Sequence, residues 1–412
     1  MKYGLIGERL GHSFSKDVHA MLADYSYELC EIAKDELGDF MKKADFSAIN
    51  VTIPYKEAVI PYLSYVSEEA KRIGAVNTVL KRDGKLYGYN TDFFGMSAQI
   101  NKMRLNLKGK KTVILGTGGT SKTAQAVAES MGAYPILVVS RTKRDGVIDY
   151  EELTSEHLDA QIIINTTPVG MYPDNDSCPI DVTLFKSLVG VIDAIYNPIR
   201  TKLVLDALSM GACAEGGLYM LVAQAVYASE IFLGVKHPKE KLEKIFKKIR
   251  RKKENIVLIG MPASGKSTVA NLLSHELSRE GCDTDELVKR ARGTSIPEIF
   301  EKEGESAFRD YESEAVALAS VKNGAVIATG GGAVLRSENV RRLKQNGVLF
   351  FIDRPCEKLL PTVDRPLAND VEAIKKRYAE RYEIYLGAAD TVIDADDTPV
   401  NIAKKIMGAF YK

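Results

Sequence analysis

Residues 260–267, GMPASGKS, constrain the fold of this chain more than any other segment. They match the G-x-x-x-x-G-K-[ST] pattern of a phosphate-binding loop. The apolar run NIVLI before them is typical of a buried strand, and STVANLLSHEL after them has the spacing of an amphipathic helix. In this order, the loop's backbone N–H groups and the positive end of the helix point at one place, which suits an anion. The segment therefore predicts a parallel-sheet domain that binds phosphate.

The side chains of this loop indicate a nucleotide with a metal ion. Lys266 is placed to neutralise β- and γ-phosphate oxygens, and the hydroxyl of Ser267 is placed to ligate Mg²⁺. The alternative interpretation of this loop is a glycine-rich turn that binds no ligand. We expect ATP and Mg²⁺ as cofactors, with the nucleotide held by Gly260, Ser264, Gly265, Lys266, Ser267 and Thr268.

A second glycine-rich loop, GTGGTSKT at residues 116–123, also follows an apolar strand and precedes a helix. It is an imperfect G-x-G-x-x-G, because Ser121 stands at the third glycine, so a turn that binds nothing stays open. The next strand ends in SRTKR, where an NAD site would offer an acidic residue. Positive charge there favours NADP(H). The predicted cofactor residues are Gly116, Gly118, Gly119, Arg141, Thr142 and Arg144, with Gly217 added from a later loop.

Strand-like apolar runs alternate with helical patterns on both sides of a basic segment, residues 236–255. Alternation of this kind predicts an α/β fold with parallel sheets and helices on both faces. The basic segment carries Leu242, Ile245, Phe246 and Ile249 at helical spacing, so we expect a short amphipathic helix on the preceding domain, followed by a basic linker. The more specific alternative is a nucleic-acid-binding patch, but the rest of the chain balances the positive charge of this segment.

Composition limits the classes of partner. Of 412 residues, 45% are hydrophobic and 27% charged, and the net charge is +1, which gives no electrostatic case for nucleic acid or membrane. Five cysteines without a CxxC pair argue against disulfides and zinc, and the N-terminus lacks a signal-peptide pattern. We expect a cytoplasmic protein with small-molecule substrates, no nucleic-acid or membrane partner, and homo-oligomerisation left open.

The N-terminal third supplies polar groups suited to ketone reduction. GHSFS at residues 11–15 puts Ser13 and Ser15 on one side of an extended segment. Lys56 follows a strand that ends in proline, and Asn77 and Asp92 come from later motifs. A lysine paired with an aspartate can protonate a ketone oxygen while hydride arrives from the other side. Taken alone, Lys56 could equally be a solvated surface lysine without a catalytic role.

The C-terminal third offers acids and arginines behind the phosphate-binding loop. Asp283 and Asp285 flank one threonine, so on a strand they would point to the same side. Arg309 stands near a helix start, a strand ends in three glycines at residues 330–332, and Arg365 lies in a segment suited to a lid. Singly, such residues are also typical of surface acids, ion pairs and tight turns.

Residues 2 to about 235 resemble shikimate dehydrogenase. The matching motifs are GHSFS at 11–15, NVTIPYK at 50–56, GAVNT at 74–78, GYNTD at 88–92, NTTPVGM at 165–171, DAIYNP at 193–198 and GGLYMLVAQ at 216–224. The resemblance implies a two-lobed enzyme with Lys56 and Asp92 as the catalytic pair. It implies that the substrate is held by Ser13, Ser15, Thr52, Asn77, Asp92, Tyr196 and Gln224.

Residues from about 254 to 412 resemble shikimate kinase, through the phosphate-binding loop and the DTD, FRDYE, GGG and RPL motifs in order. The resemblance implies that Asp285 is the general base and that Asp283 serves the Mg²⁺ shell with Ser267. It implies a lid that brings Arg365 over the transferred phosphoryl group, with Lys266. Shikimate would be held by Asp285, Arg309, Gly331, Gly332 and Arg381.

The two resemblances describe consecutive reactions, since the first half would make what the second phosphorylates. We expect NADPH-dependent reduction of 3-dehydroshikimate to shikimate, and then ATP-dependent phosphorylation to shikimate 3-phosphate. The expected parts are a substrate lobe (1–105 with 216–250), a Rossmann NADP-binding lobe (106–215) and a P-loop kinase domain (254–412). Two alternatives remain: an N-terminal half acting on quinate or a related polyol acid, and one half serving as a non-catalytic sensor or scaffold.

Overall fold

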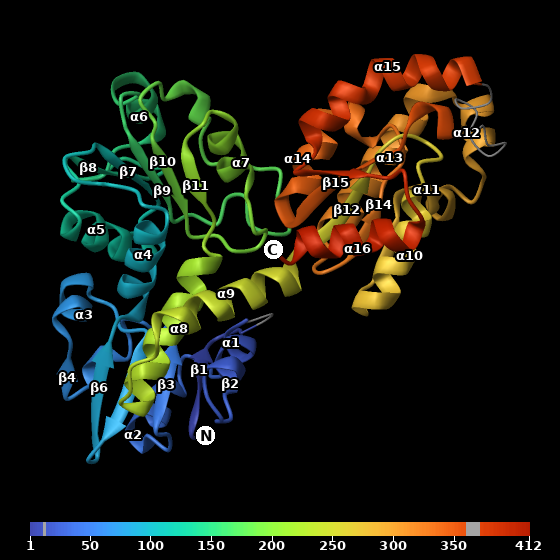
Figure 1. The fold of residues 1–412 in the computed structure, drawn as a ribbon. Helices are drawn as coiled ribbons and strands as arrows, with labels where there is room; N and C mark the ends of the chain where they lie inside the picture. The colour runs from blue at the N-terminus through green and yellow to red at the C-terminus, as the bar shows by residue number, and fades with distance from the viewer. Residues whose placement is uncertain (11–13, 360–370) are drawn as a thin grey trace. The chain divides into compact units, whose positions relative to one another are not determined.

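The computed structural model describes residues 1–10, 14–359 and 371–412, and the chain divides into two compact units, Met1–Ile249 and Arg250–Lys412 (Figure 1). Each unit is an assembly of sheets and helices with its own core. The first contains two sheets and the second contains one. The predicted α/β class is confirmed in both units.

The first sheet has six strands in the order β2-β1-β3-β5-β6-β4. Their bounds are β1 Tyr3–Gly7, β2 Glu28–Glu31, β3 Ala48–Val51, β4 Tyr65–Val66, β5 Thr78–Arg82 and β6 Lys85–Tyr89. The helices of this region are α1 Ser15–Leu22, α2 Leu37–Lys43, α3 Glu68–Ile73 and α4 Thr91–Lys102. Strand β1 pairs in parallel with both β2 and β3, as the alternation of patterns predicts.

This sheet also contains an antiparallel hairpin that the sequence analysis did not anticipate. Strands β5 and β6 pair antiparallel, and β3 pairs antiparallel with β5. The connection is Asp83–Gly84, and both residues have positive φ, 51° and 74°. An Asp-Gly pair between strand-like runs is a strong hairpin signal, because a two-residue primed turn needs positive φ at both positions.

The second sheet is fully parallel, in the order β11-β10-β9-β7-β8. Its strands are β7 Thr112–Leu115, β8 Ile136–Val139, β9 Ile162–Asn165, β10 Gly190–Asp193 and β11 Cys213–Glu215. Its helices are α5 Gly119–Ser130, α6 Tyr150–Glu156 and α7 Lys202–Ser209. Alternate strand residues bury against opposite layers: Val113 packs with Leu153 and Leu203 of α6 and α7, and Ile114 packs with Val127 of α5. Both faces are therefore covered, which explains why these strands are apolar throughout.

Two further helices follow, α8 Leu218–Leu233 and α9 Lys239–Lys253. Ile245, Phe246 and Ile249 of α9 are buried against α8, as the apolar spacing predicts. The expected linker after this helix is wrong. The basic run stays helical through Lys253, and only Glu254 separates it from the next strand.

The second unit has a parallel sheet in the order β13-β14-β12-β15-β16. Its strands are β12 Asn255–Ile259, β13 Gly281–Asp283, β14 Val326–Ala328, β15 Gly347–Asp353 and β16 Thr391–Asp394. Its helices are α10 Lys266–Leu277, α11 Thr284–Arg292, α12 Ile296–Lys302, α13 Gly304–Ser320, α14 Ser337–Asn346, α15 Val371–Ala388 and α16 Pro399–Phe410. Two apolar clusters lie on its two faces, one with α13, α14 and α15 and the other with α10 and α16.

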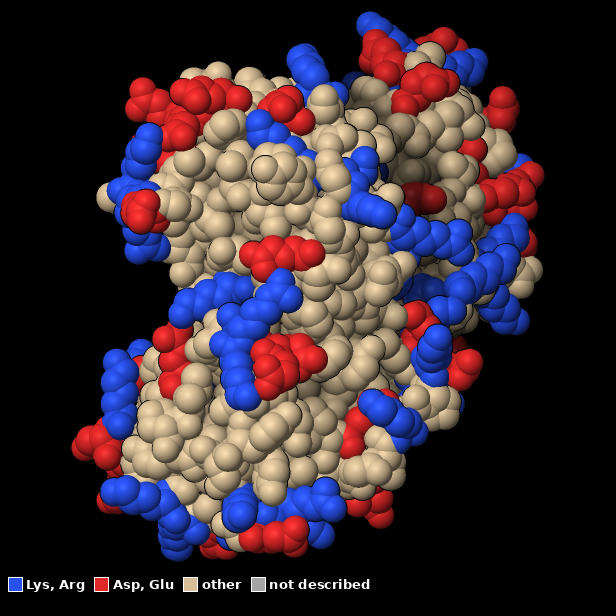
Figure 2. All heavy atoms as spheres, turned by 90° about the vertical axis from the view of Figure 1, so that its left-hand side faces the viewer, with Lys and Arg blue, Asp and Glu red and all other residues tan. Residues whose placement is uncertain are grey.

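The surface and the helices agree with the composition. Basic and acidic side chains are interspersed over most of the face in Figure 2, in keeping with the net charge of +1. Among the helices that the structure describes, none is long and apolar enough to cross a membrane.

Candidate active sites

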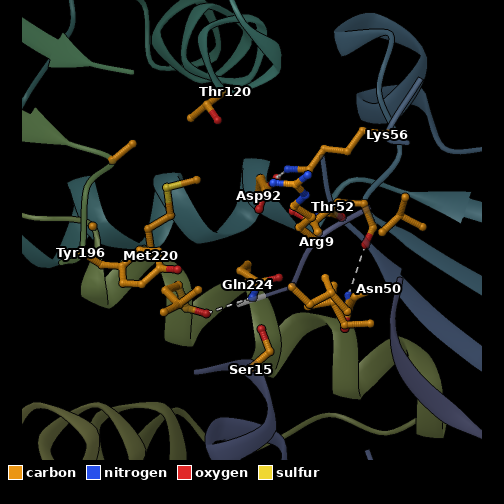
Figure 3. A pocket seen from close by; sticks show the side chains of 17 residues that line it. Arg9, Ser15, Asn50, Thr52, Lys56, Asp92, Thr120, Tyr196, Met220 and Gln224 are labelled. Atoms are coloured by element: carbon orange, nitrogen blue, oxygen red, sulfur yellow. Dashed lines mark hydrogen bonds and ion pairs between the residues drawn. The ribbon is translucent and has the colours of Figure 1, made fainter. Parts of the chain in front are cut away.

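The first unit contains a pocket of about 430 Å³ at the carboxyl ends of strands from both sheets (Figure 3). Ligands of open α/β sheets commonly bind at this edge. The pocket is lined by the predicted residues Ser15, Thr52, Lys56, Asn77, Asp92, Tyr196, Gly217 and Gln224. Ser13 lies outside the described residues. The structure therefore brings together every one of these predicted side chains that it describes.

The centre of this pocket is an ion pair. Lys56 Nζ donates to Asp92 Oδ2 at 2.6 Å, and their side chains are 21% and 14% exposed. Asp92 is the second residue of α4, while Lys56 follows β3, so the pair joins segments 36 residues apart. Partial burial keeps the pair in contact with the pocket while limiting water. An ammonium held this way can donate a proton to an oxygen bound beside it.

Hydrogen bonds behind the pocket orient its amides. The Asn77 carboxamide oxygen accepts from the backbone N–H of Thr91 at 2.7 Å. Asn50, which the prediction left out of the site, lines the pocket and accepts from the Tyr27 hydroxyl at 2.7 Å. Its amide nitrogen donates to Thr78 Oγ1 at 3.0 Å. Fixed amides of this kind suit a polyhydroxylated ligand, whose hydroxyls need oriented donors and acceptors.

The structure corrects one prediction for this pocket, the conformation of Ser15. Ser15 was expected in an extended segment, but it opens helix α1, after Phe14 in a helical conformation. The error came from treating alternate hydroxyls as evidence for a strand, where a short helix start also suits Ser. Arg9, Thr120, Met220 and Leu221 also line the pocket and were not predicted.

The glycine-rich loop at residues 116–123 has the geometry of a dinucleotide turn. Gly116 has φ of 104°, and a Cβ there would come within 2.8 Å of Thr166 Oγ1. Gly118 precedes the first residue of α5, and open space lies beside both Gly118 and Gly119. Backbone of a ligand-binding turn can thus approach a diphosphate at the helix N-terminus. Ser121, at the third glycine position, is fully buried.

The strand that follows presents cations to solvent. Arg141, Thr142 and Arg144 are exposed, and neither arginine has an ion pair with a residue that the structure describes. Lys143 between them is committed to Glu152. The backbone N–H of Thr142 donates to Ser140 Oγ at 3.2 Å, which tightens the turn. Two uncommitted guanidinium groups beside the dinucleotide turn fit a phosphate on the cofactor's ribose.

In the second unit the phosphate-binding loop closes on its own lysine. Gly265 has φ of 92°, and α10 begins at Lys266. Lys266 Nζ donates to the carbonyls of Gly260 and Met261 at 2.9 and 2.8 Å. The hydroxyl of Ser264 is buried and has no hydrogen-bond partner among the described residues. A bound phosphate would offer acceptors to both side chains, so the loop fits a nucleotide.

Ser267 and Thr268 are exposed at the start of α10, and Ser267 Oγ donates to Asp283 Oδ2 at 2.7 Å. These two oxygens fit a Mg²⁺ shell, which favours hydroxyl and carboxylate ligands. The expectation that Asp283 and Asp285 share a strand is wrong. Asp283 ends β13 and caps α11 by accepting from the backbone N–H of Asp285 at 2.9 Å, so Asp285 lies in the first helical turn.

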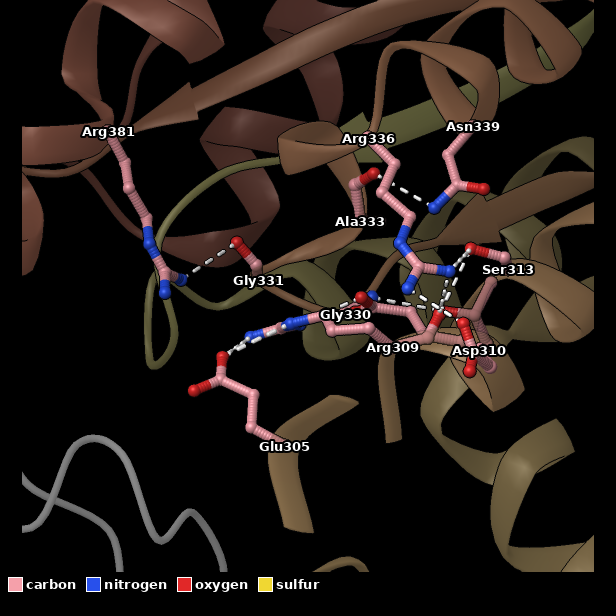
Figure 4. A network of polar contacts seen from close by, with 12 residues as sticks. Glu305, Arg309, Asp310, Ser313, Gly330, Gly331, Ala333, Arg336, Asn339 and Arg381 are labelled. Atoms are coloured by element: carbon pink, nitrogen blue, oxygen red, sulfur yellow. Dashed lines mark hydrogen bonds and ion pairs between the residues drawn. The ribbon is translucent and has the colours of Figure 1, made fainter. Parts of the chain in front are cut away.

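A small pocket of about 60 Å³ lies beside this loop and is lined by the predicted Asp285, Arg309, Gly331, Gly332 and Arg381. Arg309, in the second turn of α13, donates to Glu305 at 2.9 Å (Figure 4). It also donates to Glu312 at 2.8 Å. Arg381 donates to the Gly331 carbonyl at 3.4 Å. A Cβ at Gly332 would lie 1.8 Å from the Arg309 guanidinium, so any other residue there would displace this side chain. Arg365 lies outside the described residues.

Glu312 is the site residue that the prediction missed. It is 1% exposed, and burial raises the pKa of its carboxyl, an effect that Arg309 opposes. A Cβ on Gly330 would meet both Glu312 Oε1 and Asp285 Oδ1, at 2.5 and 2.6 Å, so the two acids converge on that glycine. The signal was available, because residues three apart on a helix face each other and Glu312 follows Arg309 by three.

Family comparisons agree with this division. The family model for the shikimate dehydrogenase substrate binding domain matches residues 5–79, and the family model for shikimate kinase matches residues 262–410. Among curated proteins, the shikimate dehydrogenase (NADP(+)) of Clostridium perfringens strain 13 is 37% identical over 269 residues, which is 60% of this chain and 98% of that protein. The corresponding protein of Clostridium beijerinckii is 38% identical over 247 residues and is covered to 91%.

Solved structures match the same 60% of the chain. Shikimate dehydrogenase 1 from Peptoclostridium difficile has a TM-score of 0.55 at 39% identity, with 98% of that chain covered. A chorismate mutase/shikimate 5-dehydrogenase fusion protein from Clostridium acetobutylicum has a TM-score of 0.57 at 36% identity, with 96% covered. Shikimate 5-dehydrogenase from Thermus thermophilus, in complex with NADP(H) and shikimate, has a TM-score of 0.55 at 28% identity, with 99% covered.

Proposed function

The chain belongs to the shikimate dehydrogenase family over its first unit and carries a shikimate kinase domain in its second, and from this premise we propose how its residues perform two consecutive reactions. The first is the NADPH-dependent reduction of 3-dehydroshikimate to shikimate. The second is the ATP-dependent phosphorylation of shikimate to shikimate 3-phosphate. The protein is thus a bifunctional enzyme of the shikimate pathway.

In the first unit we assign proton transfer to Lys56 and Asp92. NADPH supplies the hydride when bound. Lys56 donates a proton to the ketone oxygen, and Asp92, 2.6 Å away, holds the lysine in position until it does so. The remaining predicted residues hold the substrate: Ser13, Ser15, Thr52, Asn77, Tyr196 and Gln224. Gly116, Gly118, Gly119 and Gly217 accommodate the cofactor, and Arg141, Thr142 and Arg144 select its 2′-phosphate.

In the second unit we assign the nucleotide to Gly260, Ser264, Gly265, Lys266, Ser267 and Thr268, and Mg²⁺ to Ser267 and Asp283. Mg²⁺ supplies charge neutralisation of the phosphates when bound. Asp285 accepts the proton of the attacking hydroxyl. Arg309 and Arg381 hold the substrate carboxylate, with Gly331 and Gly332 along the ring, and Arg365 acts on the transferred phosphoryl group.

One observation supports the two-site proposal above the others: a pocket in the first unit brings together Lys56 and Asp92, and a pocket in the second brings together Asp285, Arg309 and Arg381, although these residues come from segments far apart in the sequence. The Lys56–Asp92 pair, the phosphate-binding loop and Asp285 argue against a non-catalytic sensor or scaffold. The comparisons do not favour that alternative, nor a quinate enzyme.

We also propose a division of the chain into three structural parts and a cellular compartment for the enzyme. We divide the chain into residues 1–105 with 216–250, 106–215 and 254–412, since each range holds one of the three sheets or the helices packed on it. We place the enzyme in the cytoplasm. All five cysteines lie within the described residues and are free, which suits a reducing compartment.

The proposal is tested by steady-state assays of the full chain. We expect NADP⁺-linked oxidation of shikimate with a kcat/KM about tenfold or more above that for quinate, since an extra hydroxyl must find a partner in the pocket. We also expect ADP formation from Mg-ATP that depends on added shikimate. Equal use of quinate would replace the assigned substrate, and ADP formation without shikimate dependence would remove the kinase assignment.

A further inference from the structure

The phosphate-binding loop of the second unit has a further cation beside it, Arg354, to which no role has been given. Arg354 directly follows strand β15, which pairs in parallel with β12, the strand that leads into the loop. Its guanidinium nitrogen Nη1 lies 3.9 Å from the position that a Cβ on Gly265 would occupy. Because Gly265 directly precedes α10, the guanidinium lies at the N-terminus of that helix, where the loop would receive phosphate.

Arg354 has no partner among the residues that the structure describes. Its side chain is partly buried, and Nε is shielded from solvent without a hydrogen-bond acceptor in the described ranges. The adjacent acid, Asp353, accepts hydrogen bonds from the hydroxyls of Tyr382 at 3.0 Å and Tyr378 at 3.4 Å. A buried donor without an acceptor costs free energy, and a cation at the positive end of a helix is disfavoured. An anion bound between Arg354 and the loop would remove both costs.

We propose that Arg354 binds the α- and β-phosphates of ATP, which stay with the nucleotide, and so sets the affinity of the kinase site for ATP and ADP. The inference rests on the proposed function, because ATP is the phosphoryl donor assigned to this loop. A guanidinium presents several N–H donors to phosphate oxygens. From the loop itself, Lys266 and the unpaired hydroxyl of Ser264 would meet the same phosphate chain.

The order of the strands separates Arg354 from the phosphoryl acceptor. The sheet runs β13-β14-β12-β15-β16 (Figure 1). Asp285 follows β13, and Gly331 and Gly332 follow β14, so the substrate pocket lies on one side of β12. Arg354 follows β15 on the other side of β12 and does not line that pocket. The γ-phosphoryl group must face the acceptor, which leaves Arg354 beside the part of ATP that is not transferred.

The test separates nucleotide affinity from turnover in the full chain. Arg354→Gln is expected to raise the KM for ATP and the calorimetric dissociation constant of ADP about tenfold each, since charge-assisted hydrogen bonds are lost. The kcat and the KM for shikimate should each stay within about threefold, because the transferred group and the acceptor keep their contacts. The inhibition constant of inorganic tripolyphosphate against ATP should also rise about tenfold, because this probe carries a phosphate chain without the base.

Two further variants control the experiment. Arg354→Lys keeps the charge but loses the planar fork, so the dissociation constant of ADP should rise only about threefold. This variant carries the test if Arg354→Gln does not fold. Arg290→Gln removes an exposed arginine from α11 in the same unit and should change none of these constants.

Three results would overturn the inference. An unchanged dissociation constant for ADP in Arg354→Gln would show that Arg354 does not contact the nucleotide. A fall in kcat at an unchanged KM for ATP would assign Arg354 to the transferred group, and an unchanged inhibition constant for tripolyphosphate would assign it to the base. Wild-type chain that binds ADP but forms none from ATP and shikimate would contradict the kinase assignment alone, so the two failures are distinguishable.

Discussion

The two pockets of this chain contain similar charged side chains, but these side chains have different interaction partners in the two units. In the first unit the pocket is about 430 Å³, and its catalytic pair faces open space with the lysine already on its aspartate. In the second the pocket is about 60 Å³, and the protein itself holds the cations: Arg309 of the pocket donates to two glutamates, and Lys266 of the adjacent phosphate-binding loop donates to two carbonyls of that loop. The dehydrogenase site is thus preformed, whereas the kinase site must exchange internal partners for ligands.

This difference indicates how much of the ligand-binding free energy is offset by rearrangement of the protein in each unit. A preformed pair contributes fully to the transition state, because no rearrangement precedes the reaction. In the kinase pocket, part of the attraction between Arg309 and a carboxylate is offset by partial loss of its contacts with Glu305 and Glu312. Kinase activity should therefore depend most on groups that gain partners on binding.

Lys266→Ala should produce the largest effect and should confine it to one unit. We expect the kinase kcat to fall about 10³-fold, because a positioned charge on the transferred phosphoryl group is removed. Dehydrogenase kcat should be unchanged, as measured by NADPH formation from shikimate. Lys404→Ala, an exposed lysine on α16, is the matched control. A kinase rate within a fewfold of wild type would break the comparison.

Lys56→Ala probes the preformed site. Its dehydrogenase kcat should fall about 10²-fold, with the KM for NADPH within about threefold, as expected when a proton donor is lost and cofactor contacts remain. Lys85→Ala, an exposed lysine of the same lobe, should behave as wild type. Normal turnover in Lys56→Ala would mean that the open pair is structural rather than catalytic.

His19 offers a pH test restricted to the first unit. Burial lowers its pKa to about 3, and the ring stacks on Tyr27 with centroids 3.8 Å apart. Because the unfolded chain binds the proton near pH 6.5 and the folded chain does not, stability is full above pH 6.5 and is lost as pH falls. Between pH 7.5 and 5.5 this group should cost about 1.4 kcal/mol of unfolding free energy.

The measurement is urea unfolding followed by loss of dehydrogenase activity, at both pH values. His19→Phe should abolish that part of the pH dependence, since Phe does not titrate, while the exposed His275→Gln of the second unit should leave it intact. The same pH slope in wild type and His19→Phe would show that His19 is not held neutral.

Arg141→Gln should give the smallest effect. We expect the KM for NADPH to rise about tenfold while that for NADH stays within about twofold, because only NADPH carries the 2′-phosphate. Lys143→Gln, whose lysine is already committed to Glu152, should change neither. Equal weakening of both cofactors by Arg141→Gln would remove the case for phosphate selection.

Much of this fold follows from local patterns in the sequence. The run NIVLI, for example, forms strand β12, because it buries both faces and allows few other structures. The residue sets of the two pockets were predicted from the family resemblances, and the structure places their described members together. The expected ion pair of Lys56 with Asp92 came from the family resemblance, because a lone lysine has no such signal.

The wrong predictions have a common cause. Each comes from a segment whose sequence fits two local structures, of which only one forms. Asp283–Asp285 could end a strand or cap a helix, and the cap prevails because Asp283 satisfies two free N–H groups of α11. At Asp83–Gly84 the turn signal competes with the pattern of parallel strands, and the turn prevails because both residues have positive φ and join the antiparallel strands β5 and β6. Glu312 escaped notice because its role depends on burial, and burial depends on the packing of α13 against the glycine turn.

A coupled reaction tests the central claim most directly. The full chain is given 3-dehydroshikimate, NADPH and Mg-ATP, and NADPH oxidation and ADP formation are followed together. Two working sites predict that shikimate accumulates without ATP and that shikimate 3-phosphate forms with it, with one ADP for each NADPH oxidised at completion. NADPH oxidation without ADP formation, or neither, would contradict the presence of two catalytic sites in one chain.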